Sequence, residues 1–189
     1  MEREESYMAK PPYDGITALR TLRDRLDEAA SLEVIHPGGH VWKAYFAFKP
    51  SAAVEEIEVV KQELQISLPP AYERFLGYSD GALLYHDKEY GQWGFKLYST
   101  QELFTANVRR RKPYGDAWPT AYFIFAESLG DSDLLVLDVS QPIDGGDDCH
   151  VIDGDSGYLP HEWRSAARSF GKWLDRLVVA QGAKYWRWY

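Results

Sequence analysis

The sequence has little cysteine and no long apolar run, and each shortage excludes a class of structure. A single cysteine, Cys149, among 189 residues excludes an intrachain disulfide and fits a reducing compartment. The longest apolar runs, at 121–126 and 134–137, fall far below the ~18 residues that a membrane-spanning helix needs. The charged first ten residues contain no apolar segment typical of a signal peptide. We therefore expect a cytoplasmic protein without a membrane segment.

Basic residues are missing from one long stretch. Residues 113–163 contain no Lys or Arg but eleven Asp and Glu, whereas residues 164–189 carry six bases and one acid. The net charge of −8 is therefore concentrated in the middle of the chain. Such a segment repels nucleic acid and attracts cationic partners, although it is also consistent with an acidic rim that only keeps the protein in solution.

Length and composition favour one domain. A chain of 189 residues can bury a single core, and we expect a flexible tail over 1–12 followed by one domain over 13–189. Aromatic residues are abundant, at 15% with seven Trp and thirteen Tyr. Aromatic rings supply core packing and are also frequent anchors of binding surfaces.

Apolar periodicity and turn residues divide the chain into helices and strands. Leu68-Pro69-Pro70 separates two helices, and Ser99-Thr100-Gln101-Glu102 is a capping box at the start of another. The helices are expected at 16–30, about 52–64, 71–78, 100–110 and about 165–181, the last followed by an aromatic tail. The strands are expected at 33–35, 41–48, 82–86, 92–98, 121–126, 134–138 and 149–153. Consecutive strands with short links predict an α+β fold, a single domain with a mostly antiparallel sheet of about five to six strands flanked by helices.

The segments that look chemically active have simpler explanations. Gly154-Asp155-Ser156-Gly157 resembles the nucleophile segment of serine proteases, but no base and acid are placed to activate Ser156, so a turn is the better interpretation. Cys149 and the five His do not have metal-ligand spacing. We therefore expect no catalytic residue, no metal and no cofactor.

Two further features are open to a binding role. The basic run 109–112 lies at an expected helix end, where cations complement the helix dipole, and a local contact with the protein's own acidic segment is favoured over nucleic acid. The many Trp residues leave a carbohydrate-binding module as an alternative, which depends on how many of them are exposed.

The stretch 51–103 carries a family resemblance. Its ordered motifs are Leu64-x-Ile66-x-Leu68-Pro69, x-x-Tyr72-x-x-Phe75-Leu76, a turn at Gly81, and Leu97-Tyr98-Ser99-x-x-Glu102-Leu103. Later motifs are Phe123-Ile124-Phe125-Ala126, Gly130-Asp131, and Ser169-Phe170-x-x-Trp173-Leu174. In this order the motifs resemble the SUKH superfamily, in the Smi/Knr-like branch of yeast cell-wall-synthesis regulators and bacterial toxin-immunity proteins.

The resemblance implies a single α+β domain without enzymatic activity that binds another protein. We expect an immunity protein that neutralises a cognate toxin, with a regulatory or scaffolding domain as the alternative. If the toxin is basic, such as a nuclease, acidic and aromatic side chains would contact it and direct nucleic-acid binding is not expected. The proposed contacts are Asp131, Asp133, Asp144, Asp147, Asp148, Trp93 and Tyr90.

Overall fold

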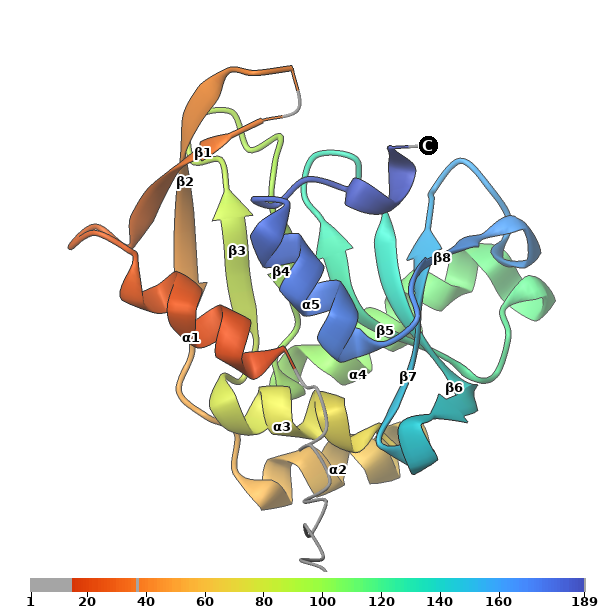
Figure 1. The fold of residues 1–189 in the computed structure, drawn as a ribbon. Coiled ribbons are helices and arrows are strands. Elements are labelled where there is room, and N and C mark those ends of the chain that lie inside the picture. The colour runs from red at the N-terminus through yellow and green to blue at the C-terminus, as the bar shows by residue number, and fades with distance from the viewer. Residues whose placement is uncertain (1–14, 37, 189) are drawn as a thin grey trace, which may run out of the picture.

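An eight-stranded antiparallel sheet forms the centre of the molecule, and its strands lie side by side in the order in which they occur in the sequence, from β1 to β8 (Figure 1). The computed structural model describes residues 15–36 and 38–188, so the tail expected at 1–12 lies outside the described residues. The strands are β1 (Ser31–Ile35), β2 (Val41–Phe48), β3 (Ala82–His86), β4 (Phe95–Leu97), β5 (Tyr122–Ser128), β6 (Leu134–Ile143), β7 (Asp148–Gly154) and β8 (Arg164–Ala167).

Five α-helices accompany the sheet. They are α1 (Ile16–Asp24), α2 (Val54–Leu64), α3 (Pro70–Tyr78), α4 (Thr100–Arg111) and α5 (Phe170–Val179). Helices α1, α3 and α5 contact one another on one side of the sheet, whereas α4 packs against β5 and α2 (Figure 1). The predicted α+β class with an antiparallel sheet is confirmed, but the sheet has eight strands rather than about five to six.

Local signals account for several element boundaries. Pro70 is the first residue of α3, where its missing N–H costs nothing. The predicted capping box starts α4: the Ser99 N–H donates to Glu102 Oε2 at 3.1 Å. Burial acts to raise the pKa of Glu102, but hydrogen bonds from Lys96 and Ser99 outweigh it and lower that pKa to about 2.

The core is built around aromatic side chains. Tyr72 of α3 and Phe170 of α5 have ring centroids 5.2 Å apart, and Phe125 of β5 and Trp173 of α5 are 5.1 Å apart. All four are fully buried. Edge-to-face packing of such rings adds to the burial of their apolar area. These residues belong to the motifs that suggested the family, so much of that resemblance consists of core residues.

Three predicted elements need correction. The helix expected at 16–30 ends at Asp24, because the Asp27 carboxylate then accepts N–H bonds from Ala29 and Ser31 and forms a turn. The strand expected at 92–98 shortens to Phe95–Leu97. The helix expected at about 165–181 is instead strand β8, which pairs with β7, followed by the shorter α5 with Ser169 as its N-cap.

Candidate functional site

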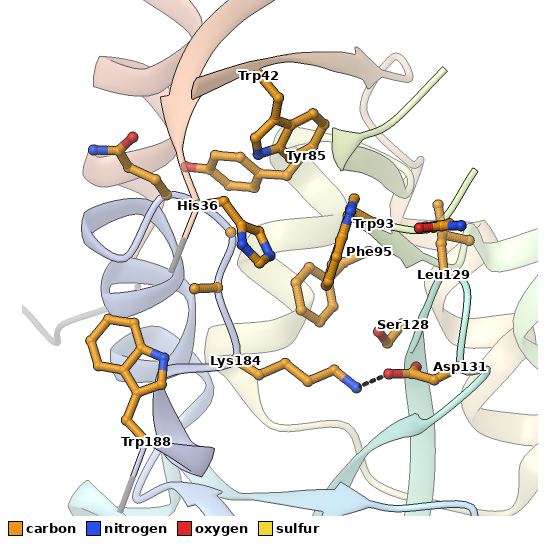
Figure 2. A pocket seen from close by; sticks show the side chains of 15 residues that line it. His36, Trp42, Tyr85, Trp93, Phe95, Ser128, Leu129, Asp131, Lys184 and Trp188 are labelled. Atoms are coloured by element: carbon orange, nitrogen blue, oxygen red, sulfur yellow. Dashed lines mark hydrogen bonds and ion pairs between the residues drawn. The ribbon is translucent and has the colours of Figure 1, made fainter. Parts of the chain in front are cut away.

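An aromatic hollow of about 230 Å³ opens between the segment before β4 and the segment after α5 (Figure 2). We call it the aromatic hollow. Its ring-bearing lining residues are His36, Trp42, Tyr85, Trp93, Phe95 and Trp188. Gln92, Asp131, Gln181 and Lys184 contribute polar groups to the same lining. Binding sites are often of this kind, mostly apolar with a few placed polar groups.

One wall is positioned by a close approach of backbone to backbone. Gly94, with a φ of 118°, follows Trp93, and a Cβ there would lie 2.6 Å from the Tyr85 carbonyl oxygen. Only glycine lets the two segments meet in this way. Trp93 is thereby held outside the core at 44% exposure, with its ring 4.3 Å from the ring of His36.

The opposite wall comes from the residues after α5. The Trp186 ring packs 6.1 Å from Phe95 and 6.5 Å from Trp173, which anchors the short 3₁₀ helix Tyr185–Arg187 on the core. Trp188 follows, is 53% exposed and lines the aromatic hollow. Residues after α5 therefore form the second wall of the hollow, opposite the wall formed by the residues before β4.

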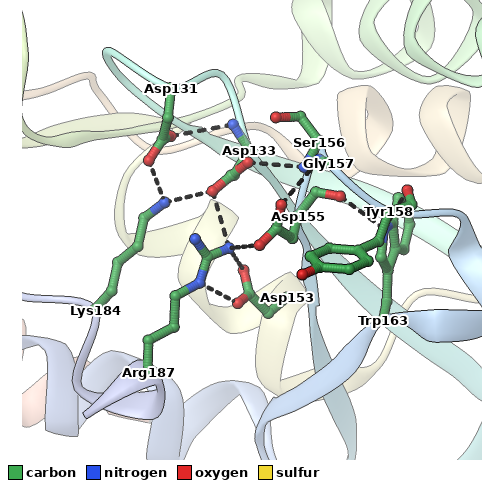
Figure 3. Close-up of polar contacts among 10 residues, drawn as sticks. All are labelled: Asp131, Asp133, Asp153, Asp155, Ser156, Gly157, Tyr158, Trp163, Lys184 and Arg187. Atoms are coloured by element: carbon green, nitrogen blue, oxygen red, sulfur yellow. Dashed lines mark hydrogen bonds and ion pairs between the residues drawn. The ribbon is translucent and has the colours of Figure 1, made fainter.

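Lys184 joins this wall to the acidic segment (Figure 3). Its Nζ lies 2.6 Å from Asp131 Oδ2 and 2.7 Å from Asp133 Oδ2. Asp131 is on the rim of the hollow with a 49% exposed side chain, whereas Asp133 is buried behind it. Burial acts to raise the pKa of Asp133, but hydrogen bonds from Lys184 and from the Ser156 N–H outweigh it, so this carboxyl has a lowered pKa.

Arg187 extends the same cluster. Its Nε and Nη2 bind the two oxygens of Asp153 at 2.5 and 2.7 Å, and Nη2 lies 2.9 Å from Asp133 and 3.4 Å from Asp155. We call Lys184 and Arg187, together with the four carboxylates that they bind, the C-terminal clasp. Four carboxylates against two cations leave the cluster negative overall.

Three of the seven residues predicted as partner contacts lie together. Trp93 and Asp131 line the aromatic hollow. Tyr90, which is 70% exposed, lines a neighbouring hollow of about 370 Å³ that Trp93 and Trp42 also border. Trp93 thus stands between two depressions of one surface. Asp133 lies just below this surface as part of the C-terminal clasp.

Asp147 and Asp148 lie elsewhere. Asp147 forms a two-point ion pair with Arg74, at 2.8 and 2.6 Å. Asp148 is 2% exposed, and its carboxylate accepts backbone N–H bonds at the start of α5, while burial raises its pKa. The side chain of Asp144 lies outside the described part of the chain. Asp147 and Asp148 are therefore left out of the site.

Sequence reasoning missed the roles of Trp42, Trp188 and Lys184. Trp42 of β2 is only partly buried and lines both depressions. The sequence shows the aromatic tail, but no local pattern in it indicates that Trp188 would line the same hollow as His36 and Trp93. The alternation of rings with Lys184 and Arg187 was the one available signal.

Three groups that the sequence singled out are buried or bonded within the fold itself. Ser156 lies in a turn, as the sequence predicts, and its N–H donates to Asp133 Oδ1 at 2.8 Å. The Cys149 thiol is buried and its pKa is raised by that burial. Arg110 pairs with Glu127, which confirms the expected contact between the basic run and the acidic segment.

Residues 15–36 and 38–188 contain neither a metal-ligand cluster nor a membrane-spanning helix. No group of three or more His, Cys, Asp or Glu side chains in these ranges converges as metal ligands would. No helix among the same residues is both long and apolar enough to traverse a bilayer.

Comparison with known proteins identifies a family and a relative to which the sequence is similar. A family model described as the SMI1 / KNR4 family (SUKH-1) matches residues 51–176. The chain is also similar to an uncharacterised protein, YobM, of Bacillus subtilis (strain 168), with 24% identity over 171 residues and 88% of each chain covered. The matched span includes Trp93 and Asp131 but stops before Lys184 and Trp188.

Proposed function

The chain belongs to the SMI1 / KNR4 family (SUKH-1), and from that premise we propose that it is a non-enzymatic, protein-binding immunity protein that neutralises a cognate bacterial toxin. The family includes toxin-immunity proteins, and in general its members are not catalytic. The observation that carries the proposal is the surface on which Trp93, Tyr90 and Asp131 lie together around two adjoining depressions.

The composition of this surface suits a protein interface. Tryptophan and tyrosine are the residue types that most often dominate binding energy, because each buries a large rigid area at a small cost in side-chain entropy. The C-terminal clasp supplies a negative field beside the rings. A basic toxin domain would be attracted to this field, and the association rate would fall as salt screens the charges. Inhibition would be steric: once bound, the immunity protein would cover the active surface of the toxin.

The test is co-expression with the product of the adjacent gene. We expect the two proteins to co-purify and the host cells to survive only when both are present. Asp131→Lys should weaken this binding and slow association, because it reverses a rim charge. Asp116→Lys, at an exposed acid of the 3₁₀ helix Lys112–Ala117 that lines neither depression, is the matched control and should bind like the wild type.

Two results would contradict the proposal. Failure of wild-type protein to bind or protect would remove the immunity role. Equal binding by wild type and Asp131→Lys would show that the partner uses another surface. Co-purification of a host protein with no toxic activity would instead support the alternative of a regulatory or scaffolding domain.

A further inference from the structure

We propose that the aromatic hollow receives one arginine side chain from the partner, with its guanidinium stacked on Trp93 and hydrogen-bonded to Asp131. This inference rests on the proposed protein-binding function and specifies what the surface recognises. It assigns the hollow to a positively charged, planar group supplied by a basic segment of the partner.

The size of the hollow fits one side chain. Pockets for drug-sized molecules usually measure roughly 300–1,000 Å³. The aromatic hollow, at about 230 Å³, is smaller than that. Interfaces often concentrate their binding energy where one large side chain of the partner fills such a central, well-lined pocket. Arginine is among the residue types most enriched at these positions.

The lining favours a cation that has flat faces. Trp93 and Trp188 present indole rings on opposite walls (Figure 2), and both are about half exposed. Indole is the strongest of the aromatic partners for a cation, and the planar guanidinium can stack on a ring as well as interact with its electron density. A lysine ammonium, which is compact and more strongly hydrated, uses such a wall less well.

Asp131 would orient the guanidinium by accepting hydrogen bonds from it. Its Oδ2 accepts from Lys184 and its Oδ1 accepts the Asp133 N–H at 3.2 Å. A carboxylate has about four acceptor positions, so both oxygens can accept further bonds from a guanidinium. Asp131 and Lys184 are the clasp residues that line the hollow, and the three carboxylates behind them, with Arg187, leave the clasp as a whole negative, which disfavours an anionic occupant.

The same acidic cluster already holds one arginine of the chain itself. Arg187 binds both oxygens of Asp153 and also reaches Asp133 and Asp155. Three carboxylates of the cluster thus already bind a guanidinium, whereas Asp131, the one that lines the hollow, binds Lys184. An apolar side chain in the hollow would instead cover the open acceptor positions of Asp131 without bonding to them, at the cost of desolvating the carboxylate.

The experiment uses the full chain and a set of short peptides. The probes are acetyl-Gly-Arg-Gly-amide, the same peptide with citrulline, which has nearly the shape of arginine without its charge, and the same peptide with lysine. Binding is measured by NMR through the indole N–H signals of Trp93 and Trp188, each identified by its Trp→Phe variant. We expect the arginine peptide to shift both signals and to bind roughly tenfold more tightly than the citrulline peptide.

Matched variants separate the hollow from the rest of the surface. Trp93→Ala and Asp131→Asn should each weaken binding of the arginine peptide. Phe104→Ala removes an exposed ring on α4, and Asp116→Asn removes an exposed charge, both away from the hollow, so these should leave binding unchanged. A circular dichroism spectrum of each variant checks that its fold is retained.

Equal affinity for the arginine and citrulline peptides, or no loss of binding in Trp93→Ala, would overturn the inference. Tighter binding of maltotriose than of the arginine peptide would overturn it too and would identify a sugar site. Toxin binding by wild type that Trp93→Ala leaves intact would refute the arginine pocket while preserving the immunity function. Binding of the arginine peptide without any binding of the toxin would refute the immunity function and preserve the pocket.

Discussion

Removing the carboxylate of Asp148 is expected to destabilise the fold, because this side chain joins β7 to the start of α5. Its Oδ1 accepts the N–H of Cys149 at 2.7 Å and of Phe170 at 2.9 Å, and its Oδ2 accepts the N–H of Gly171 at 3.0 Å. Two of these donors belong to the first turn of the helix, which has no partners for them within the helix itself.

The magnitude follows from what the substitution leaves behind. Asp148→Ala leaves three buried N–H groups without an acceptor, and each such group costs about 1–3 kcal/mol. Partial relaxation and water entry reduce the sum, so we expect a loss of about 3–5 kcal/mol. Asp148→Asn retains one acceptor oxygen but places an amide N–H₂ opposite a donor, and its loss should be about 1–3 kcal/mol.

Urea unfolding followed by tryptophan fluorescence measures these changes, with the slope m expected to stay the same while the midpoint falls. Asp147→Ala is the neighbouring control. Its side chain is paired with Arg74 but partly exposed, so its removal should cost about 1 kcal/mol. A loss of less than about 1 kcal/mol for Asp148→Ala would refute the capping role. Wild-type stability combined with lost partner binding would show instead that Asp148 is a contact residue.

Three more measurements examine other parts of the structure. The pKa of Glu102 is lowered to about 2 from its ordinary 4.5, so its contribution to stability is present above pH 4.5 and is lost as the pH falls towards 2. In urea unfolding, the difference in stability between wild type and Glu102→Gln should therefore disappear over that range of pH. Cys149 is 1% exposed and should react with a maleimide only after unfolding, so rapid labelling of the native protein would contradict its burial. Gly182 has a φ of 82°, and a Cβ there would lie 2.4 Å from the Tyr85 ring, so Gly182→Ala should cost about 2 kcal/mol or more in the same unfolding assay; an unchanged midpoint would show that the ring moves aside freely.

Local patterns were sufficient for much of the fold. The Pro69-Pro70 break and the Ser99–Glu102 box depend on neighbours within a few residues, so the sequence predicts both boundaries. Strand β8 was read as helix because Ala166, Ala167 and Phe170 have helical spacing. Its hydrogen bonds come from β7, and a pairing of that kind between separate segments leaves no local pattern.

The candidate site likewise depends on contacts between distant segments that no local pattern predicts. Asp147 and Asp148 are adjacent and identical in the sequence, yet one forms an ion pair near the surface and the other caps a helix more than twenty residues further on. Composition predicted acidic and aromatic contacts, and Trp93 and Asp131 do lie together. It did not predict Trp188, because the proximity of that residue to Trp93 arises only from the folding back of the last segment.

The sequential order of the sheet has a consequence for the protein during synthesis. Each strand pairs only with strands that neighbour it in the sequence, so no pairing waits for a strand from a distant part of the chain, and each can form while the chain leaves the ribosome. The aromatic hollow differs, because its second wall comes from residues 181–188. A chain that terminated prematurely before Gln181 would contain every strand and still lack Lys184 and Trp188. The proposed binding site would therefore be completed only after every strand of the sheet has been synthesised.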